Sequence, residues 1–547
     1  MKYVWLFVLL ILSCMCEMFY FEKSAGVTPF VHCHDLGLVY IDEPIPDIGM
    51  YRCEGNATLD LVRFHSPRAM GEKKITVERH PVTRYKSGFE ARLNGHLEMW
   101  SIPTMDTGVS PLRAYFHLNA YGLAEKGYDG RNTTISIIDS CFYKAYDCTN
   151  LVVAENDISG GNNIWQPFDG SDCFHGTEIW SLLTGRGECT NGILPAVSIN
   201  AREINIENNL LTDVVFAKSL YGVGRGSIIV FSFVAVGDYD KTRNTVIIRR
   251  TVKSSAERGA VYFASAGNSG SLQNRTSETT CLDSTLAGMP YLFPIAANCP
   301  SGSCWYTEVG CIAFSAPGGD DSSCLIASDG DRCTCVAGTS FAAPYAGSVA
   351  AAMQQVCNNT LTGMDIYDAM VRSSTTENVD LKDGALFLKN GGGVLYSRRY
   401  GHGLLNMGNA IDYVTKNNCP HVPSKLISCF TERVIVNATG RAIGTVDIAP
   451  PTSCSIKTVV FVKVYAVIPF KIFWFNDWYI SSPQKSIPCT LLPKQHPYMQ
   501  DSLDIETGCR EFYREPYSSN GTWSVHYNIQ YRKPSRTTYM LEIMGWE

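Results

Sequence analysis

A serine, a histidine, an aspartate and an asparagine occur along this chain in a pattern that could activate a hydroxyl group. Ser340 lies in the run 338–344, which predicts a helix of small side chains with Pro344 in its first turn. A serine hydroxyl becomes a good nucleophile only when a base removes its proton and a third group orients that base. Because a serine at a helix entrance more often caps the helix, the assignment depends on partners elsewhere in the chain.

Three such partners precede Ser340. Asp139 ends an apolar, strand-like run, His175 opens a predicted helix, and Asn268 follows the strand-like segment 261–265. Singly, each has a plain structural interpretation, as a cap or turn residue, a hydrogen-bonded histidine, or a turn asparagine. Together they follow a known order of the catalytic triad, Asp, His, Ser. The Asn268 amide and the Ser340 N–H, at the positive end of a helix, could stabilise an oxyanion.

The predicted strands and helices of the chain indicate two regions with different architectures. Strands and helices alternate from about residue 134 to 354, which predicts a parallel sheet with helices on both faces. Beyond a proline-containing junction near Cys419, the strand-like runs 432–436, 458–462, 522–527 and 539–543 predict a separate sandwich. The apolar run 459–475 contains Lys463 and Lys471, so sandwich strands explain it better than a membrane helix.

The chain resembles subtilisin-type serine proteases from about Tyr121 to Ile411, most specifically around Ser340. The segments 118–130, 305–308 and 399–410 resemble those of kexin/furin-like proprotein convertases. The resemblance implies an α/β subtilisin-like parallel sheet flanked by helices, followed by an all-β, jelly-roll-like sandwich (the P domain). It also implies that Ser340 attacks, His175 is the general base and acid, Asp139 orients it and Asn268 binds the oxyanion. We expect a signal peptide at 1–16, a propeptide-like region at 17–95, a catalytic domain at 96–418 and a P-domain-like sandwich at 419–547.

The substrate-binding segments depart from the convertase pattern. Ser140 stands where convertases favour a second aspartate, and residues 232–235 read Ser-Phe-Val-Ala where they have Ser-Trp-Gly-Pro. Asp238, Asp240 and Asp283 could still select a basic substrate side chain through charge-assisted hydrogen bonds. They could equally be calcium ligands or solvated loop acids. The resemblance further implies structural Ca²⁺, for which Asp147 and Glu308 are the candidate ligands.

Composition favours a secreted globular protein. The 547 residues are 45% hydrophobic and carry a net charge of −6, which gives no reason to expect a nucleic-acid partner. The apolar run 4–12 fits a signal peptide, and no later run predicts a transmembrane anchor. Of 21 cysteines, two fall in that leader, and the remaining odd number predicts mainly disulfides in a secreted or lumenal compartment. Candidate glycosylation sites are Asn56, Asn132, Asn274, Asn358, Asn437 and Asn520.

Maturation and specificity are less constrained by the sequence. The region 17–95 corresponds to the inhibitory propeptide of related enzymes, so the chain's own propeptide is an expected inhibitor. No multibasic cleavage site lies between Arg84 and Trp100. Protein or peptide substrates are expected, with processing after basic residues as the first hypothesis. A broad-specificity secreted subtilase and an inactive, substrate-binding pseudoprotease are the alternatives.

Overall fold

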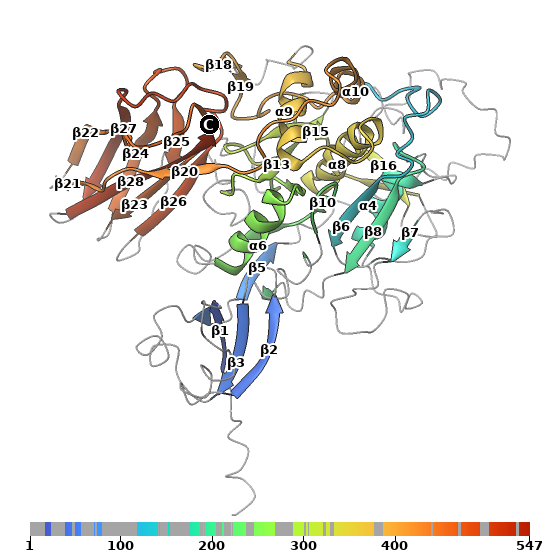
Figure 1. Ribbon diagram of the computed structural model, residues 1–547, viewed down its shortest axis with the longest axis horizontal. Helices are drawn as coiled ribbons and strands as arrows, with labels where there is room; N and C mark the ends of the chain where they lie inside the picture. Colours follow the sequence, from blue (N-terminus) through green and yellow to red (C-terminus); the bar gives the residue numbers. More distant parts are fainter. Residues whose placement is uncertain are drawn as a thin grey trace, which may run out of the picture.

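The computed structural model describes residues 17–22, 39–45, 50–55, 70–71, 74–78, 118–139, 142, 151–153, 174–185, 190, 192–203, 210–212, 220, 223–236, 246–268, 288–299, 302–304, 306–320, 324–328, 333–376, 387–438, 441–468, 472–492, 503–531 and 535–547 (Figure 1). The predicted signal peptide therefore lies outside the described residues. Within these ranges, no helix is long and apolar enough to cross a membrane.

A largely parallel sheet forms the centre of the molecule. Its strands lie in the order β14-β13-β12-β10-β6-β8-β7, and β15 also pairs with β13. Strands β10, β12 and β13 are buried along their whole length, as expected for parallel strands covered on both faces. The bounds are β6 (Thr134–Asp139), β7 (Leu151–Val153), β8 (Ser198–Glu203), β10 (Ile228–Phe231), β12 (Val261–Ser265), β13 (Leu292–Cys299), β14 (Gly302–Ser303) and β15 (Phe314–Pro317). The predicted parallel sheet is confirmed.

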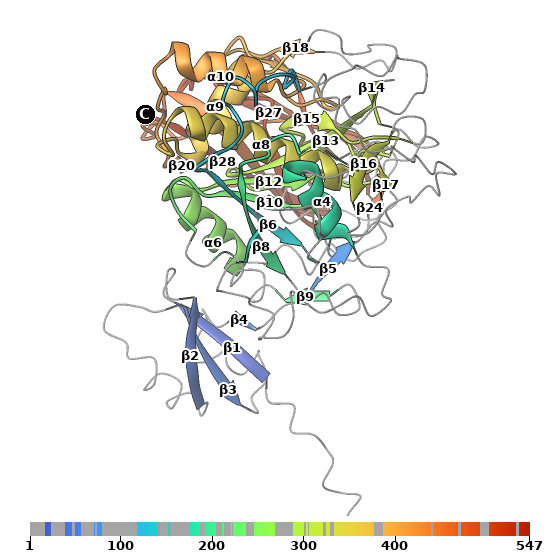
Figure 2. The same cartoon turned by 90° about the vertical axis from the view of Figure 1, so that its right-hand side faces the viewer.

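Helices pack on this sheet. Figures 1 and 2 show α8, α9 and α10 grouped together, with α6 apart from them. Helix α8 contacts β6, β10, β12, β13 and β15, and its small residues allow a close approach. A methyl group on Gly347 would lie 2.8 Å from Cγ2 of Val230, so a larger residue there would push the helix off β10. The helices are α4 (His175–Thr184), α6 (Val246–Glu257), α8 (Thr339–Val356), α9 (Gly363–Ser373) and α10 (Met407–Lys416).

The C-terminal part of the chain is a sandwich of two antiparallel sheets. One has the order β20-β28-β23-β26, with β21 also on β28, and the other the order β22-β27-β24-β25. The apolar run 459–475 contributes to β23 and β24, as predicted. The bounds are β20 (Ile427–Phe430), β21 (Val434–Ala438), β22 (Arg441–Ile448), β23 (Thr458–Ile468), β24 (Ile472–Ser481), β25 (Cys489–Leu492), β26 (Leu503–Cys509), β27 (Trp523–Tyr531) and β28 (Ser535–Trp546).

A turn of the sandwich carries charged side chains into the boundary with the first domain. The Arg510 guanidinium is buried, donates through Nη2 to the backbone oxygens of Met289 and Leu292, and lies over the ring of Phe293. Four residues later, Arg514 donates both Nε and Nη2 to the carboxylate of Asp368 on α9, at 2.7 Å each. Such pairing offsets the cost of removing charges from water.

Disulfides connect the ends of several elements. Cys357, after α8, is bonded to Cys419, after α10. Cys335 is bonded to Cys324, which joins β17 (Cys333–Val336) to β16 (Leu325–Ser328) just before α8, so the disulfide predicted for the nucleophile loop is confirmed. Other disulfides among the described residues are Cys299–Cys304, Cys429–Cys454 and Cys489–Cys509.

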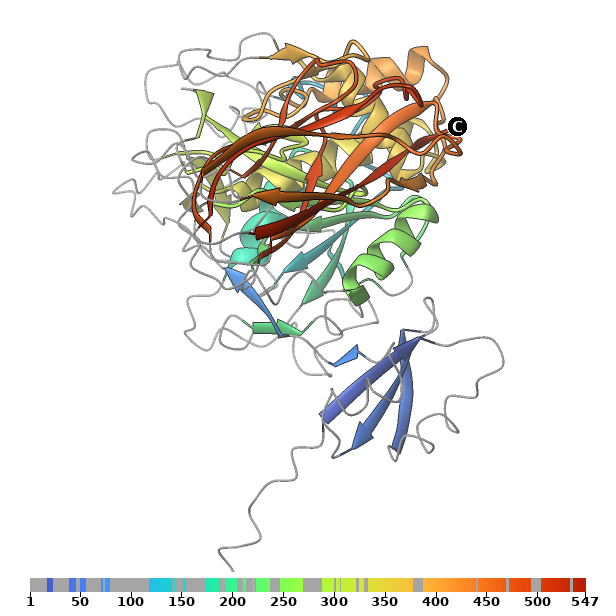
Figure 3. The ribbon, with the colours of Figure 1, turned by 90° about the vertical axis from the view of Figure 1, so that its left-hand side faces the viewer.

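The N-terminal region forms a small antiparallel sheet of its own (Figure 3). It contains β1 (Glu17–Glu22), β2 (Val39–Ile45), β3 (Met50–Gly55) and β4 (Met70–Gly71), in the order β2-β3-β1-β4. The next strand, β5 (Lys74–Glu78), pairs instead with β9 (Leu210–Thr212) and β11 (Val234–Val236) of the following domain. A short hairpin, β18 (Leu388–Lys389) and β19 (Leu395–Tyr396), completes the described elements.

Candidate active site

Three adjacent parallel strands bring sequence-distant polar residues to one edge of the central sheet. Asp139 is the last residue of β6, Ser232 follows β10, and Asn268 comes three residues after β12. The register pairs Phe231 of β10 with Ile138 on one side and with Ala264 on the other. The carboxyl ends of the three strands therefore lie side by side, and the ends of β6 and β12 flank that of β10.

Asp139 and His175 form a hydrogen-bonded pair. Nδ1 of His175 lies 2.9 Å from Oδ1 and 3.0 Å from Oδ2 of Asp139, whose side chain is almost completely buried. An ionised carboxylate only accepts hydrogen bonds, so Nδ1 is the protonated nitrogen of the ring. In a neutral imidazole this leaves Nε2 with a lone pair. The histidine side chain is 21% exposed, so the ring remains in contact with the surface.

Asn268 is hydrogen-bonded to the loop that carries Ser340. Its Oδ1 accepts from the backbone N of Thr339 at 2.9 Å and from Oγ1 of Thr339 at 2.7 Å. The Thr339 hydroxyl in turn accepts from the Gly267 N–H at 3.1 Å. Since backbone N–H can only donate, the oxygen of the Asn268 amide is fixed on Thr339, and the Nδ2 group is left to donate elsewhere. A Cβ atom on Gly338 would lie 3.3 Å from this Nδ2, which places it beside the entrance of α8.

Ser340 lies between two residues that touch the other candidates. Thr339 binds Asn268, and the ring of Phe341 lies 5.7 Å from the ring of His175, centroid to centroid. The N-cap of α8 is Gly338, at φ 156° and ψ 158°, a conformation open essentially to glycine. Ser340 is thus the second residue of the helix and not its cap, so the capping interpretation of this serine is wrong.

The prediction that Pro344 lies in the first helical turn is also wrong. Because α8 begins at Thr339, Pro344 is inside the helix, in its second turn. A proline there cannot donate the i→i−4 hydrogen bond to the carbonyl of Ser340. The helix begins about one turn earlier than expected because its start is fixed by the tertiary contacts of Thr339 with Asn268, which local sequence does not reveal.

Glu308 contacts Gly267, the residue that precedes Asn268. Its side chain is buried, its N–H donates to the Gly267 carbonyl at 3.0 Å, and its carboxyl carbon lies 2.6 Å from where a Cβ on Gly267 would be. Gly267 has φ 115°, so both backbone and space require glycine. One carboxylate supplies only part of the six to eight oxygens that Ca²⁺ takes. In the ranges described, the His, Cys, Asp and Glu side chains that converge in a group of three are Cys489, Cys509 and Glu511, and these cysteines form a disulfide.

The remaining predicted site residues divide into two groups. Of the six sequons, Asn132, Asn358, Asn437 and Asn520 are exposed. The candidate substrate residues Ser140, Asp238, Asp240 and Asp283, the candidate calcium ligand Asp147, and the sequons at Asn56 and Asn274 lie outside the described residues. Sequence reasoning assigned no role to Thr339 or Phe341, although both belong to the run that contains Ser340.

Comparisons with known proteins identify the family. The model of the subtilase family matches residues 102–403, more than half of the chain. Furin-1 of Xenopus laevis is 24% identical over 406 residues, which cover 70% of this chain and 50% of the relative. Endoprotease bli of Onchocerca volvulus is 26% identical over 317 residues, which cover 54% of this chain and 44% of the relative. The chain therefore spans about half the length of these curated relatives.

Solved structures agree on the fold. The serine protease of Aeromonas sobria, in complex with its chaperone ORF2, superimposes with a TM-score of 0.61 at 16% identity over 79% of this chain and 90% of that chain. The same protease without the chaperone gives a TM-score of 0.58 at 17% identity, over 78% and 91% of the two chains. At such identity the likeness concerns the fold alone. Together with the family match, it places this chain in the subtilase family of serine proteases, as a divergent member similar to furin-like relatives.

Proposed function

We propose that this protein is a secreted serine endopeptidase that uses Asp139, His175 and Ser340 as its catalytic triad and Asn268 as an oxyanion donor. The observation that carries the proposal is the Asp139–His175 pair, with Nδ1 held by both carboxylate oxygens. The hydrogen bonds from Thr339 to Asn268 and the packing of Phe341 on His175 support the inclusion of Ser340.

In this mechanism Nε2 of His175 takes the proton of the Ser340 hydroxyl as its oxygen bonds to the scissile carbonyl carbon. Asp139 keeps the ring in the tautomer that makes this possible and stabilises the resulting imidazolium. The negative charge on the substrate oxygen would be met by Nδ2 of Asn268 and by backbone N–H groups at the start of α8. The imidazolium then protonates the leaving amine, and water hydrolyses the acyl-enzyme by the reverse sequence.

A fluorophosphonate probe tests the triad directly, because it labels only an activated serine. We expect the mature protein to be labelled, the Ser340→Ala variant to be unlabelled, and Ser348→Ala, in the buried part of the same helix, to keep its labelling. Equal labelling of the wild-type protein and of Ser340→Ala would place the nucleophile elsewhere. A folded wild-type protein that takes no label would favour the pseudoprotease.

We propose further that β5 is the inhibitory strand of a propeptide that spans residues 17–95. Strand β5 is paired on both sides, with β11 and with β9, in the manner of an extended peptide added to exposed strand edges. Its pairing with β11 is antiparallel, and its last residue, Glu78, is opposite Val234. Val234 comes two residues after Ser232, at the end of β10, so the carboxyl end of β5 is directed to the edge that carries Asp139.

A separately produced 17–95 fragment tests this role of β5. We expect it to inhibit the mature enzyme, and we expect a Val77→Pro fragment to inhibit at least tenfold more weakly, because proline removes a ladder donor. Val77→Thr, which keeps the donor and the strand propensity, is the matched control. Equal inhibition by all three fragments would assign inhibition to the N-terminal sheet instead of to β5.

We also propose processing after basic residues, with Asp238, Asp240 and Asp283 as the candidate acids that select the substrate side chain and Ser140 as a further candidate substrate-binding residue. The similarity to Furin-1 supports this choice over a broad-specificity subtilase. Profiling the mature enzyme on Arg-Arg peptides and on mixed peptides separates the two hypotheses. Structural Ca²⁺ with Glu308 and Asp147 among its ligands, and passage through the secretory pathway with glycosylation at the exposed sequons, belong to the same proposal.

A further inference from the structure

The buried side chain of Tyr306 has no part in the mechanism proposed above, yet it contacts the backbone that supports the loop of Ser340. Tyr306 lies between β14 and β15 in the chain, and β15 pairs with β13 beside α8, which contacts both strands (Figure 2). Its hydroxyl oxygen lies 2.8 Å from the carbonyl oxygen of Gly318 and 2.7 Å from that of Gly319, just after β15. The single phenol proton is therefore directed at two adjacent backbone acceptors.

Gly318 connects this hydroxyl to the nucleophile loop. The same Gly318 carbonyl accepts from the backbone N–H of Gly338 at 2.8 Å, and Gly338 is the N-cap of α8, two residues before Ser340. Burial raises the pKa of Tyr306 well above its usual value, and a backbone hydrogen bond from Gly338 opposes this rise only in part. The phenol thus stays protonated, and it donates to the carbonyl group that Gly338 also binds.

The next two residues extend these contacts to the loop of the asparagine. Glu308 donates its N–H to the carbonyl of Gly267, the residue before Asn268. Between Tyr306 and Glu308, the Thr307 hydroxyl accepts from the N–H of Ala297 on β13 at 3.0 Å. One three-residue segment therefore contacts the supports of both proposed oxyanion donors, and the central sheet holds its middle residue.

We propose, in an inference that rests on the proposed function, that Tyr306 is a positioning residue that sets the Ser340 N–H relative to the amide of Asn268. The backbone at Gly338 determines where α8 begins and where its first N–H groups point, and a Cβ on Gly338 would lie 3.3 Å from Nδ2 of Asn268. Without the Tyr306 hydroxyl, the Gly318 carbonyl loses a donor that fixes its direction. Because oxyanion donors act at distances of about 3 Å, a small shift of Gly338 should weaken both of them in the transition state.

Tyr306→Phe tests the proposal because it removes the hydroxyl and keeps the ring. Activity is measured on the best substrate from the peptide profiling and expressed per active site titrated with the fluorophosphonate probe, so that unfolded protein does not contribute. We expect kcat to fall about tenfold with little change in KM, because the oxyanion forms only in the transition state.

Tyr396→Phe is the matched control. This buried hydroxyl also lies between two backbone oxygens, those of Gly310 and Ile312, at 2.9 and 3.0 Å. Its loss should lower the Tm by a similar amount and leave kcat per titrated site unchanged. Equal values of kcat for Tyr306→Phe and Tyr396→Phe would overturn the inference.

A double-mutant cycle shows whether Tyr306 acts through the oxyanion donors. In the Asn268→Ala background, Tyr306→Phe should lower kcat by only about threefold or less, because one of the donors that it positions is gone. An undiminished loss in that background would mean that Tyr306 acts independently of Asn268, and the inference would be wrong. Wild-type protein that takes no probe would refute the catalytic proposal itself, whereas labelled protein whose kcat is insensitive to Tyr306→Phe would refute only the role of Tyr306.

A second measurement applies if Tyr306→Phe does not fold. Incorporation of meta-fluorotyrosine at position 306 keeps the hydroxyl, and its fluorine NMR resonance should move when a peptide aldehyde forms an adduct with Ser340. The same label at position 396 should not respond. An unchanged resonance at position 306, or an equal shift at both positions, would overturn the inference.

Discussion

Glu511 provides a test of how the two domains are held together, because it is a carboxyl group enclosed at their boundary. Burial raises the pKa of Glu511 from its usual value of about 4.5 to about 7, and this effect exceeds the opposing influence of Arg398 and Arg510. The neighbouring backbone is fixed as well, since Nδ2 of Asn390 donates to the Glu511 carbonyl at 2.9 Å. The folded protein therefore binds the Glu511 proton more tightly than the unfolded chain does.

The thermodynamic linkage between proton binding and folding gives the sign and size of the contribution of Glu511 to the free energy of unfolding. A raised pKa gives stability that is fully present below pH 4.5 and is lost as the pH rises to about 7. One pKa unit corresponds to about 1.4 kcal/mol, so the loss approaches about 3 kcal/mol at pH 8. Glutamine has nearly the same shape and no charge. Glu511→Gln should therefore match the wild-type free energy of unfolding near pH 4 and exceed it by up to about 3 kcal/mol at pH 8.

Urea unfolding at half-unit intervals between pH 4 and pH 8 measures this difference, in a Ser340→Ala background. Buried His402 also titrates, since burial lowers its pKa to about 3, and its contribution is present above pH 6.5 and lost as the pH falls toward 3. Both proteins contain His402, so its contribution cancels in the difference. Glu432→Gln, an exposed glutamate, is the matched control. Parallel stability curves for Glu511→Gln and the wild type would show that Glu511 ionises in the fold as it does in water, and the argument from burial would be wrong.

Three further perturbations test other parts of the molecule. Asn268→Ala should lower kcat about 10²–10³-fold with little change in KM, because it removes a donor to the transition state, whereas an equal effect on KM alone would argue against an oxyanion role. Arg514→Gln should lower the free energy of unfolding by about 2 kcal/mol in urea, because Asp368 keeps its buried position without its bidentate partner. Adding Asp368→Asn should recover part of that loss, and strictly additive effects would mean the pair is not coupled. A calcium chelator should lower the Tm of the wild type but change that of Glu308→Gln much less, and equal shifts would place the ion away from Glu308.

The features of the candidate site that depend on local sequence pattern could be predicted from the sequence. Asp139 ends a strand, His175 begins a helix and Asn268 follows a strand by three residues, and at such positions the periodicity of the sequence changes. Parallel strands necessarily bring such positions to one edge, so the order of the motifs sufficed to bring the residues together. The start of α8 was misplaced because it depends on Asn268, which is 71 residues from Thr339.

Contacts between distant segments were not predictable in the same way. Arg514 and Asp368 are 146 residues apart, and nothing in either local sequence indicates the other. The pairing of β5 with β11 was not predicted, for the same reason. The alternation of side chains predicts a strand, but it does not predict the neighbouring strand with which that strand will pair.

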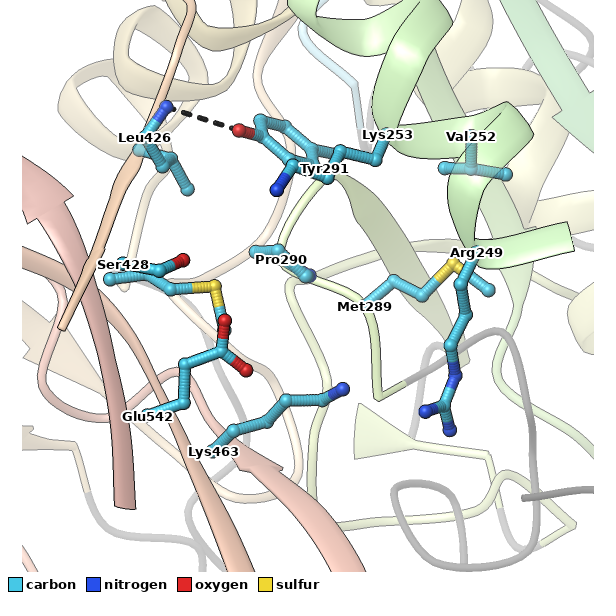
Figure 4. Close-up of a pocket in the computed structure, with 11 residues that line it drawn as sticks. Arg249, Val252, Lys253, Met289, Pro290, Tyr291, Leu426, Ser428, Lys463 and Glu542 are labelled. Carbon is cyan, nitrogen blue, oxygen red and sulfur yellow. Dashed lines mark hydrogen bonds between the residues drawn. The ribbon is translucent and has the colours of Figure 1, made fainter. Parts of the chain in front are cut away.

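The two edges of the central sheet have different roles: the carboxyl edge holds the proposed catalytic residues, and the amino edge contacts the sandwich. At the carboxyl edge lie Asp139, at the end of β6, and Asn268, three residues after β12, and among the described strands none of the sandwich pairs with the central sheet. At the amino edge, the sandwich inserts Arg510 against the carbonyl oxygens of Met289 and Leu292, where it can neutralise the outward dipoles of two backbone groups. The same short stretch, Met289 to Tyr291, lines a pocket of about 100 Å³ between the two domains (Figure 4). Because Arg510 is anchored on this segment and not at the carboxyl edge, Arg510→Gln should weaken the association of the two domains before it affects catalysis.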